Sequence, residues 1–474
     1  MEFDKDLSAR QEARLLCRQA EEAQKDLRIM TQAQLDQICK NICDQFSAAA
    51  ETLAKMAVEE TGFGNENDKT EKNQFASQHV WKAIKDMKTI GLLEEDPQKK
   101  LWHIGVPVGV IGAIVPSTNP TSTICYKAMI ALKAGNSIVF SPHPKALRCS
   151  LEAAKIVRQA AEEAGAPAGS ICCLSFASMA GTEEMMHAPE VKLILATGGP
   201  AMVKAAYSSG KPAIGVGAGN GPAYIHHSAN VQDALECILR SKTFDYGTVC
   251  ASEQSIIVEE SMADKVKHAA QKLGFYFMPP VESEKLASML FRPNGALNPL
   301  VVGKPAEQLA KMAGFCVPEN TKVMVATENE VGPKYPYSME KLCPVLAFYV
   351  MKSEAEVQKR VIEILQHEGN GHTFTMHCND RDVISRFALQ VPVSRFLVNT
   401  PAALGGIGSS TALFPALTLG CGAVGGSSSS NNISPMDLIN IRRVAWGTET
   451  PPQKTSIDSS LLEMLTAKIM ERLK

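Results

Sequence analysis

A series of short apolar segments, each followed by a helical pattern, most constrains what this chain can fold into. The run 106–115 (VPVGVIGAIV) is rich in β-branched residues and has no polar face. A strand that is apolar on both sides is typical of a parallel sheet covered by helices. The pattern continues with helical stretches at 121–134 and 146–164 and with apolar runs at 137–140, 171–174 and 191–196. This β-α-β-α-β alternation predicts a doubly wound sheet with its ligand at the carboxyl ends of the strands.

A second unit of the same α/β class is indicated further along the chain. The 474 residues, 45% of them hydrophobic, exceed one ordinary domain, so two large domains are expected. Residues 8–60 have helical spacing and predict two or three helices. Apolar strands are expected near 255–258, 346–349 and 396–398. The Gly-, Ser- and Thr-rich stretch 405–432 predicts either loops close to a ligand or neighbouring chain, or a flexible connection.

The composition excludes several classes of partner. With 48 Lys and Arg against 50 Asp and Glu, the net charge of −2 offers no field for nucleic acid or an anionic membrane. No run of 18 apolar residues predicts a membrane span, and the first residues lack a secretory pattern, so a cytoplasmic protein is expected. The thirteen cysteines are expected to be reduced thiols, and their spacing predicts no metal site.

The end of the chain has the character of an appendage. Residues 448–459 form a polar, proline-containing linker, and residues 460–474 predict a helix with Ser460 as N-cap and Glu463 completing a capping box. Leu462, Leu465, Ile469 and Leu473 fall on one face of this helix. Such a short helix is marginal alone, so its apolar face should bind a partner groove or fold back on its own domain.

Two side chains are candidates for chemistry. Cys250 follows a glycine-containing turn and could lie at the start of a helix, where the dipole lowers the pKa of a thiol. Asn119 follows the first apolar strand and could present its amide to a developing oxyanion. Alternatively, Cys250 is a small buried residue and Asn119 an ordinary turn residue before proline. The stretch ATGGP at 196–200 could begin a helix that faces a phosphate, although a G-x-G-x-x-G fingerprint is absent.

From about residue 8 to 447 the chain resembles the aldehyde dehydrogenase superfamily, and within it the coenzyme A-acylating branch. That branch includes acetaldehyde and propionaldehyde dehydrogenases of bacterial microcompartments. The matching stretches occur in the family's order: ETGFG (60–64), PSTNP (116–120), AGNSIVFSPHP (134–144), ATGGP (196–200), GAGN (217–220), FDYGTVC (244–250), EKLCPV (340–345) and LTLGCG (417–422).

The resemblance implies a role for each matching residue. Cys250 matches the nucleophile, and Asn119 matches the side chain that forms the oxyanion hole with the Cys250 backbone N–H. Glu340 matches the carboxylate that binds the nicotinamide ribose. The residues implied to surround the dinucleotide are Ile114, Val115, Pro116, Ser117, Ser141, His143, Thr197, Gly198, Gly199, Gly217, Glu340 and Leu342. Thiolate attack would give a thiohemiacetal, and loss of hydride to nicotinamide would leave a thioacyl enzyme.

The acyl acceptor is where the branches of the family differ. Hydrolytic members carry a glutamate 34 residues before the nucleophile, and here that position is Val216. Because valine cannot activate water, the resemblance implies coenzyme A as acceptor, since a thiol needs less help from a base. His372 is a candidate to take the thiol proton, or else a structural histidine in a Gly-rich loop. Ser141 and His143 stand where relatives have a lysine near the adenosine ribose, which favours NAD over NADP.

The resemblance also implies an architecture and partners. Residues 1–217 would bind NAD, 218–425 would carry the nucleophile, and 426–447 would return to the cofactor domain. A small β oligomerisation element would combine about 88–104 with 426–447 in a homodimer or homotetramer. Residues 460–474 resemble an encapsulation peptide that binds microcompartment shell or cargo proteins.

The expected reaction converts acetaldehyde or propionaldehyde, NAD⁺ and coenzyme A to acyl-CoA and NADH. The two substrates differ by one methylene, worth only about 1–3 kcal/mol, so the sequence does not choose between them. The alternatives are a hydrolytic dehydrogenase that makes free carboxylic acid and a non-catalytic scaffold on the same fold.

Overall fold

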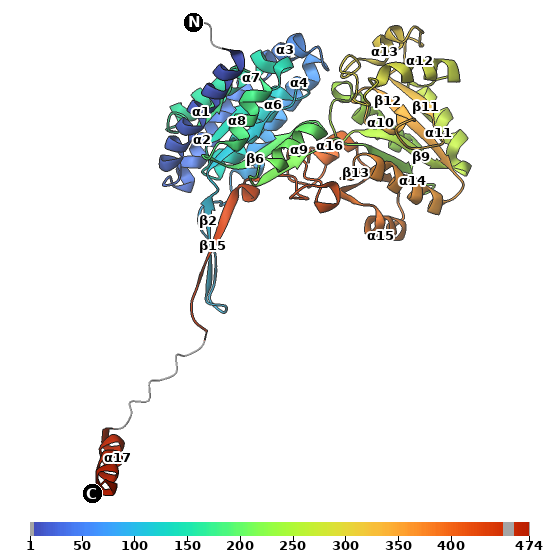
Figure 1. The fold of residues 1–474 in the computed structure, drawn as a ribbon. Coiled ribbons are helices and arrows are strands. Elements are labelled where there is room, and N and C mark those ends of the chain that lie inside the picture. Colours follow the sequence, from blue (N-terminus) through green and yellow to red (C-terminus); the bar gives the residue numbers. More distant parts are fainter. Residues whose placement is uncertain (1–3, 449–458, 474) are drawn as a thin grey trace.

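Three β-sheets organise the computed structural model, which describes residues 4–448 and 459–473. Two of the sheets are parallel and pack against helices, and the third is a small antiparallel sheet that projects from the body (Figure 1). This arrangement confirms the predicted α/β class with two doubly wound units and a small β element. None of the helices within the described ranges is long and apolar enough to cross a membrane.

The first parallel sheet has the strand order β5-β4-β3-β6-β7. The chain moves outward from β3 to β5 and then returns to the other side of β3, so its direction reverses between β3 and β6. In doubly wound sheets the ligand binds at such a reversal. The strands are β3 (Val110–Ile114), β4 (Ile138–Ser141), β5 (Ile171–Cys173), β6 (Val191–Thr197) and β7 (Ala213–Val216), with helices α6 (Pro120–Lys133), α7 (Leu147–Glu163), α8 (Met179–His187) and α9 (Pro200–Ser208) and the 3₁₀ turn η2 (Pro144–Ala146).

The apolar run that begins the sheet is two strands rather than the single strand predicted for 106–115. Strand β2 (Leu101–Pro107) pairs antiparallel with β15, and β3 starts only at Val110. Gly109 between them has a φ of 122°, a conformation that favours glycine and lets the chain change direction. Every residue of β3 and of α6 is buried, which explains why neither has a polar face.

The amino-terminal helices cover the first sheet. Helices α1 (Lys5–Leu27), α2 (Gln32–Ala48) and α3 (Ala50–Thr61) confirm the prediction for residues 8–60. They are followed by α4 (Glu66–Gln74), the π-helical turn η1 (Phe75–His79) and α5 (Val80–Ile84). Helix α4 has no apolar stripe, yet it buries Lys69, Lys72 and Asn73 against the rest of the fold.

The second parallel sheet has the order β10-β11-β12-β9-β8-β13-β14. The runs near 255, 346 and 396 correspond to β9, β12 and β14, and the other strands were not predicted. The strands are β8 (Gly221–Ile225), β9 (Glu253–Glu259), β10 (Phe275–Phe277), β11 (Val323–Thr327), β12 (Val345–Met351), β13 (Gly371–His377) and β14 (Val393–Val398). The helices and turns around them are α10 (Val231–Thr243), η3 (Phe244–Gly247), α11 (Glu260–Lys272), α12 (Pro280–Leu290), α13 (Ala306–Met312), η4 (Pro336–Ser338), α14 (Glu354–His367), α15 (Arg381–Gln390) and α16 (Ala402–Gly406).

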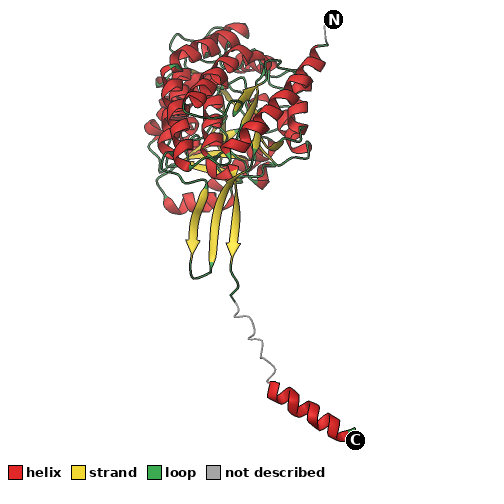
Figure 2. Cartoon of the chain, turned by 90° about the vertical axis from the view of Figure 1, so that its left-hand side faces the viewer, coloured by secondary structure: helices red, strands yellow, loops and turns green. Residues whose placement is uncertain are grey.

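The small sheet joins two distant segments. Strand β2 pairs on one side with β1 (Gly91–Asp96) and on the other with β15 (Ile439–Ala445), both antiparallel. Figure 2 shows the three strands extending beyond the helices. The loops before β15 contain the turns η5 (Ala423–Gly425) and η6 (Pro435–Leu438).

The last described element is the predicted helix, α17 (Ser459–Arg472). It begins at Ser459, so Ser460 lies inside the helix and the predicted N-cap assignment is wrong. None of its described residues is buried. Most of the predicted linker at 448–459 lies outside the described residues.

Candidate active site

A cavity of about 490 Å³ lies at the carboxyl ends of β3, β4 and β6, beside the reversal of the first sheet. Eight of the residues predicted to surround a dinucleotide line it: Ile114, Val115, Pro116, Ser141, His143, Thr197, Gly198 and Gly199. Helix α9 begins here with Gly199 as N-cap and Pro200 in its first turn, so its N–H groups can face an anionic ligand. The cavity's position at the reversal of the sheet and beside the start of α9 is therefore typical of a nucleotide site.

A buried lysine that the sequence reasoning did not single out holds two of these strand ends together. Lys127 Nζ on α6 donates to Ile114 O at 2.8 Å and to Leu195 O at 2.9 Å. Burial lowers the pKa of Lys127 to about 7. These bonds fix β3 to β6 at the point where the cavity opens.

Cys250 lies in the turn between η3 and β9, at the amino end of the second sheet. The expectation that it begins a helix and has a lowered pKa is wrong. The residue is half-buried, and burial followed by the nearby Glu340 carboxylate raises the pKa of the thiol to about 12. In the chain alone the thiol is therefore protonated at neutral pH.

Asn119 is oriented by a buried lysine from helix α4. Lys72 Nζ donates to Asn119 Oδ1 at 2.6 Å and to Asp245 Oδ2 at 2.5 Å. The lysine therefore fixes which end of the Asn119 amide carries the N–H groups, and Asn119 Nδ2 lies 3.5 Å from Thr248 O, two residues before Cys250. The structure thus brings the predicted oxyanion donor next to the cysteine turn.

Asp245 is the centre of this network. Its Oδ2 accepts from Lys69 at 2.9 Å as well as from Lys72, and its Oδ1 accepts from the Asn65 backbone N–H at 3.0 Å. Burial alone would raise the pKa of Asp245, but the two lysines outweigh it and the pKa is lowered. Burial lowers the pKa of Lys72 to about 8.

The turn that carries Asp245 is strained. Asp245 and Tyr246 both have left-handed backbone angles, with φ of 48° and 50°. Such angles persist in non-glycine residues only where the surroundings hold them. Gly64 faces this turn so closely that a Cβ there would come within 1.7 Å of Asp245 Oδ1. The glycine in the ETGFG stretch is therefore required by this close approach.

Glu340 approaches the cysteine turn from the loop before β12, and His372 from the start of β13. Glu340 Oε1 accepts from the Gly219 N–H at 2.9 Å, and burial followed by Glu368 raises the pKa of Glu340 to about 8. A Cβ on Gly219 would lie 1.9 Å from Cys250 O and 3.2 Å from His372 Cε1, so both residues pack against this glycine. Predicted residues that do not line the nucleotide cavity are Ser117, Gly217, Glu340 and Leu342.

His372 is fully buried and neutral. Its Nδ1 lies 2.9 Å from Thr373 Oγ1, and its Nε2 has no hydrogen-bond partner within the described residues. Burial, with the nearby Arg395 cation, lowers the pKa of His372 well below its usual value. The lowered pKa makes His372 a weak base in the chain without ligands, and Nε2 is the nitrogen on which it could take a proton.

Comparison with known proteins agrees with this geometry. The family model described as "Aldehyde dehydrogenase family" matches residues 5–274. The chain belongs to the aldehyde dehydrogenase family. An acetylating aldehyde dehydrogenase from Geobacillus thermoglucosidasius is 48% identical and superimposes with a TM-score of 0.93, over 96% of this chain and 100% of that one.

Two further relatives of the chain are informative. The bifunctional aldehyde-alcohol dehydrogenase AdhE of Escherichia coli is 44% identical over 92% of this chain and 50% of its own length. The chain thus spans about half the length of the bifunctional relatives it matches. A Rhodopseudomonas palustris propionaldehyde dehydrogenase, solved with bound propionyl-CoA, is 29% identical with a TM-score of 0.84, over 92% of this chain and 94% of that one.

Val216 stands at the position where the resemblance places the base of hydrolytic family members. Val216 ends β7, is 2% exposed, and belongs to the same apolar cluster that packs against Cys250. Valine has no group that can take a proton from water. Val216 and Cys250 therefore belong to one apolar region, to which Val216 contributes no proton acceptor.

Besides Lys127, sequence reasoning missed the roles of Lys69, Lys72 and Asp245. Asp245 lies within the matching stretch 244–250, but nothing there showed its partners. The only signal of the two lysines was their spacing, three apart on an otherwise polar helix, which places both on one face. Charged residues on such a helix are ordinarily exposed, so only the structure shows that these are buried against the cysteine turn.

Proposed function

We propose that this chain is a coenzyme A-acylating aldehyde dehydrogenase that converts a short-chain aldehyde, NAD⁺ and coenzyme A to acyl-CoA and NADH. The observation that carries the proposal is Val216, an apolar residue where a hydrolytic enzyme needs a base. Relatives along nearly the whole chain support it, since one is named acetylating and another was solved with bound propionyl-CoA.

In the proposed mechanism, the Cys250 thiol adds to the aldehyde carbon to give a thiohemiacetal, and loss of a hydride and a proton leaves the acyl group on Sγ as a thioester. Asn119 Nδ2 and the Cys250 N–H donate to the oxygen that becomes negative, and Lys72 keeps the amide turned the right way. When bound in the cavity beside β3 and β6, NAD⁺ supplies the hydride acceptor.

Acyl transfer then exchanges one thioester for another. His372 Nε2, which is unpartnered within the described residues, is the candidate to accept the proton of the incoming thiol, while Thr373 Oγ1 can accept from a proton on His372 Nδ1. A thiol is partly ionised near neutral pH and needs less activation than water. The apolar Val216 disfavours competing hydrolysis.

The preference for NAD follows from the side chains near the cavity. Ser141 and His143 line it, and Ser141 Oγ is hydrogen bonded to Thr182 Oγ1 at 2.8 Å. Lys145, the nearest lysine in sequence, lies over the Phe63 ring at 5.5 Å. This leaves no lysine among the lining residues to bind a 2′-phosphate.

Initial rates with a C2–C4 aldehyde series, with and without coenzyme A, test the proposal. NADH formation should depend on coenzyme A, and mass spectrometry after treatment with aldehyde and NAD⁺ should find an acyl adduct on Cys250. Steady NADH formation without coenzyme A, with release of free acid, would favour the hydrolytic alternative. Turnover that survives Cys250→Ala would exclude the thioester mechanism.

We also infer that the small sheet mediates assembly into a homodimer or homotetramer. Strand β15 exposes Ile441 and Val444, and the half-exposed Trp446 stacks edge-on with Trp102 at 5.0 Å. Exposed apolar groups on a projecting strand are typical of an interface. Ile441→Glu should reduce the molecular mass measured by analytical ultracentrifugation, and an unchanged mass would refute this role.

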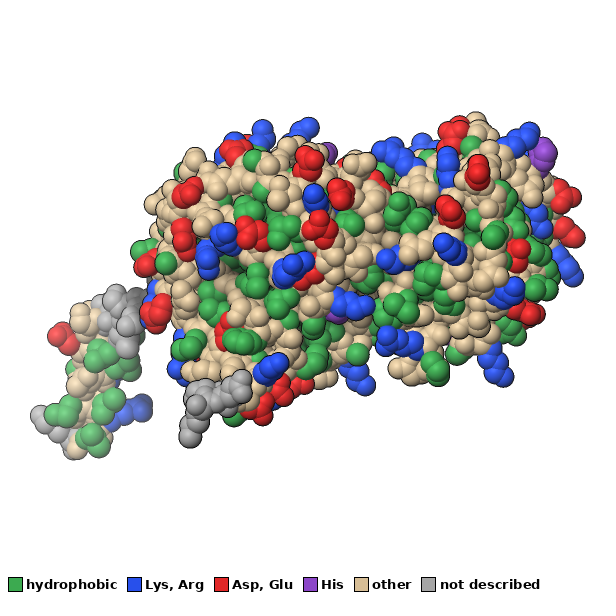
Figure 3. Space-filling model, turned by 90° about the horizontal axis from the view of Figure 1, so that it is seen from above, with side chains coloured by type: hydrophobic (Ala, Val, Ile, Leu, Met, Phe, Trp, Pro, Cys, Tyr) green, Lys and Arg blue, Asp and Glu red, His purple; other side chains and the backbone are tan. Residues whose placement is uncertain are grey.

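Helix α17 supports a location inside a bacterial microcompartment. Figure 3 shows apolar side chains on its surface, and Leu462, Leu465 and Ile469 are each more than half exposed. An exposed amphipathic helix needs a partner groove. One relative is a Clostridium phytofermentans propionaldehyde dehydrogenase of a fucose utilisation microcompartment.

Deleting residues 448–474 should abolish co-localisation with shell protein while sparing turnover. A sharper test compares two single variants, one with a negative charge on the apolar face of the helix and one with the same charge on the opposite face. Leu465→Glu should abolish co-localisation, whereas Ala467→Glu, about 200° around the helix, should not. Equal effects of the two variants, or co-localisation that survives the deletion, would contradict the proposal.

A further inference from the structure

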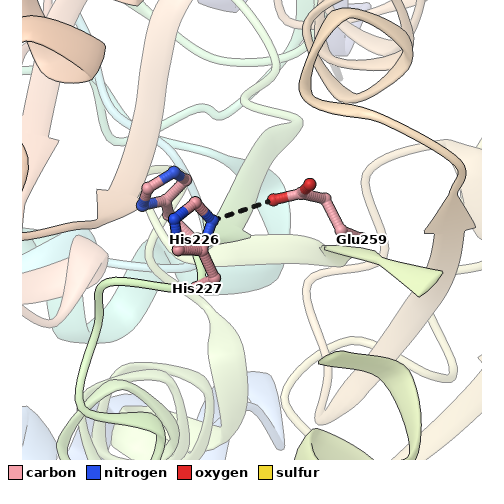
Figure 4. A group of neighbouring side chains, drawn as sticks. All are labelled: His226, His227 and Glu259. Atoms are coloured by element: carbon pink, nitrogen blue, oxygen red, sulfur yellow. Dashed lines mark ion pairs between the residues drawn. The ribbon is translucent and has the colours of Figure 1, made fainter. Parts of the chain in front are cut away.

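Three side chains meet at the carboxyl edge of the second parallel sheet, at the opposite end of β8 and β9 from Cys250. His226 and His227 directly follow β8, and Glu259 ends β9. The two strands pair in parallel with Ile225 beside Val258, so their ends are adjacent. Figure 4 shows both imidazole rings beside the Glu259 carboxylate.

The ligand atoms of this group are already close. One nitrogen of each histidine and one carboxylate oxygen lie within 4.8 Å of one another, and His227 Nδ1 is 3.5 Å from Glu259 Oε1. Ligand atoms around a tetrahedral zinc ion, each about 2.0–2.2 Å from the metal, are separated by roughly 3.4 Å. His227 is 63% exposed at its side chain, so its ring has room to rotate and close the remaining gap.

The buried member of the group has an unused nitrogen. His226 is 1% exposed, and its Nε2 has no hydrogen-bond partner within the described residues. Buried polar atoms are ordinarily satisfied, so an orphan nitrogen beside a carboxylate and a second imidazole requires an explanation. The carboxylate of Glu354 lies 3.8 Å from this nitrogen and adds negative charge beside it.

Neighbouring groups can support His226 as a ligand. Its Nδ1 is 2.8 Å from Ser228 Oγ and 3.4 Å from Cys378 Sγ. In the metal-free chain Nδ1 accepts from the Ser228 backbone N–H at 3.2 Å. A metal on Nε2 would require the ring proton to move to Nδ1, where the Ser228 hydroxyl rather than the N–H becomes its partner and accepts it. Tyr224 also donates to Glu259 Oε1 at 2.9 Å and fixes that carboxylate.

We propose that His226, His227 and Glu259 form a binding site for one divalent transition-metal ion. Two imidazoles and one carboxylate suit zinc, and cobalt can replace it as a spectroscopic probe. The site ties the end of β8 to the end of β9, and it is distinct from the cysteine turn because it lies at the other edge of the sheet. Sequence spacing predicted no metal site, because these ligands come from two strand ends rather than from one motif.

Titration of the full-length chain with Co²⁺ and Zn²⁺ tests the site directly. Thiols are first alkylated, because Cys250, Cys237 and the exposed Cys316 could bind metal by themselves. The expected result is one equivalent of Co²⁺ with the absorption of nitrogen and oxygen ligands, displaced by one equivalent of Zn²⁺. Zinc should also raise the melting temperature in a concentration-dependent way.

Variants locate the ion. His227→Ala and Glu259→Gln should each weaken binding at least about tenfold. The matched control is His268→Ala, which removes an exposed histidine from α11, outside the group. Absence of a stoichiometric site in the unaltered chain would overturn the proposal, as would binding that His227→Ala and Glu259→Gln leave unchanged. Since no step measures turnover, the outcome is independent of the proposed dehydrogenase activity.

Discussion

The two parallel sheets use opposite edges for the candidate active site. In the five-stranded sheet the cavity lies at the carboxyl ends of β3, β4 and β6. In the seven-stranded sheet Cys250, Gly219 and His372 all lie at the amino ends of β9, β8 and β13. The carboxyl edge of one sheet therefore meets the amino edge of the other.

This difference between the two sheets shows the limit of the rule that ligands bind at the carboxyl ends of parallel strands. Ligands of doubly wound sheets bind beyond the carboxyl ends of the strands, and the cavity of the first sheet lies where this rule expects a ligand. The second sheet supplies its cysteine from the loops that lead into the strands, and its own carboxyl edge is left for another use. The cluster of His226, His227 and Glu259 occupies that edge.

The largest expected difference in activity is between substitutions at the two edges of the second sheet. Cys250→Ala should reduce coenzyme A-dependent NADH formation by about 10⁴-fold or more, because the covalent step is lost. His227→Ala at the far edge should leave kcat within a factor of about two. Steady-state kinetics on both variants checks this, and a large loss in His227→Ala would contradict the separation of the two edges.

The next effect concerns the lysine that orients Asn119. Lys72→Met should lower kcat by about 100-fold, because the amide loses its fixed orientation toward the oxyanion. Lys69→Met is the matched control, since Lys69 also pairs with Asp245 but bonds Thr118 O instead of Asn119.

Both substitutions remove one partner of a buried carboxylate and should lower the free energy of unfolding by about 3 kcal/mol. Denaturant unfolding measures that shared cost, and kinetics measures the difference between them. Equal losses of kcat in the two variants would show that Lys72 acts only through stability.

Much of the first sheet could be predicted from the sequence, because its buried strands are continuous apolar runs. The single strand predicted at 106–115 failed since Pro107 and Gly109 divide it between two sheets. Strands β10 and β13 were missed because they are short or polar; β13 contains His372, Thr373 and His377, all buried. Burial of polar residues in a strand leaves no periodic signal.

Only those residues of the candidate site that lie in recognisable sequence motifs could be predicted. Eight residues that the resemblance predicts to bind the cofactor lie around one cavity. The pKa of Cys250 could not be predicted from its turn, because burial and Glu340 outweigh any local backbone effect. The network of Asp245 was invisible because its partners are more than 170 residues apart in sequence.

The raised pKa of Cys250 predicts how the thiol reacts in the chain without ligands. Below a pKa of about 12 the thiolate fraction should rise about tenfold per pH unit, so alkylation of Cys250 should accelerate throughout pH 7–10. A free cysteine, with a pKa of about 8.5, should level off within this range. Peptide mapping after iodoacetamide pulses measures both, and a plateau for Cys250 below pH 9 would contradict the buried thiol.

The smallest expected change in activity comes from a substitution of Val216, at the carboxyl edge of the first sheet. Val216→Glu places a carboxylate at the carboxyl end of β7, in the apolar cluster that packs against Cys250. It should raise NADH formation without coenzyme A by roughly tenfold at most, because a base displaced by even about 1 Å loses most of its effect. Val216→Gln introduces the same shape without a base and should give no increase. If both variants release free acid equally, hydrolysis is limited by the entry of water and not by proton transfer to a base. In that case the apolar side chain of Val216, and not the missing glutamate, determines whether water or coenzyme A takes the acyl group.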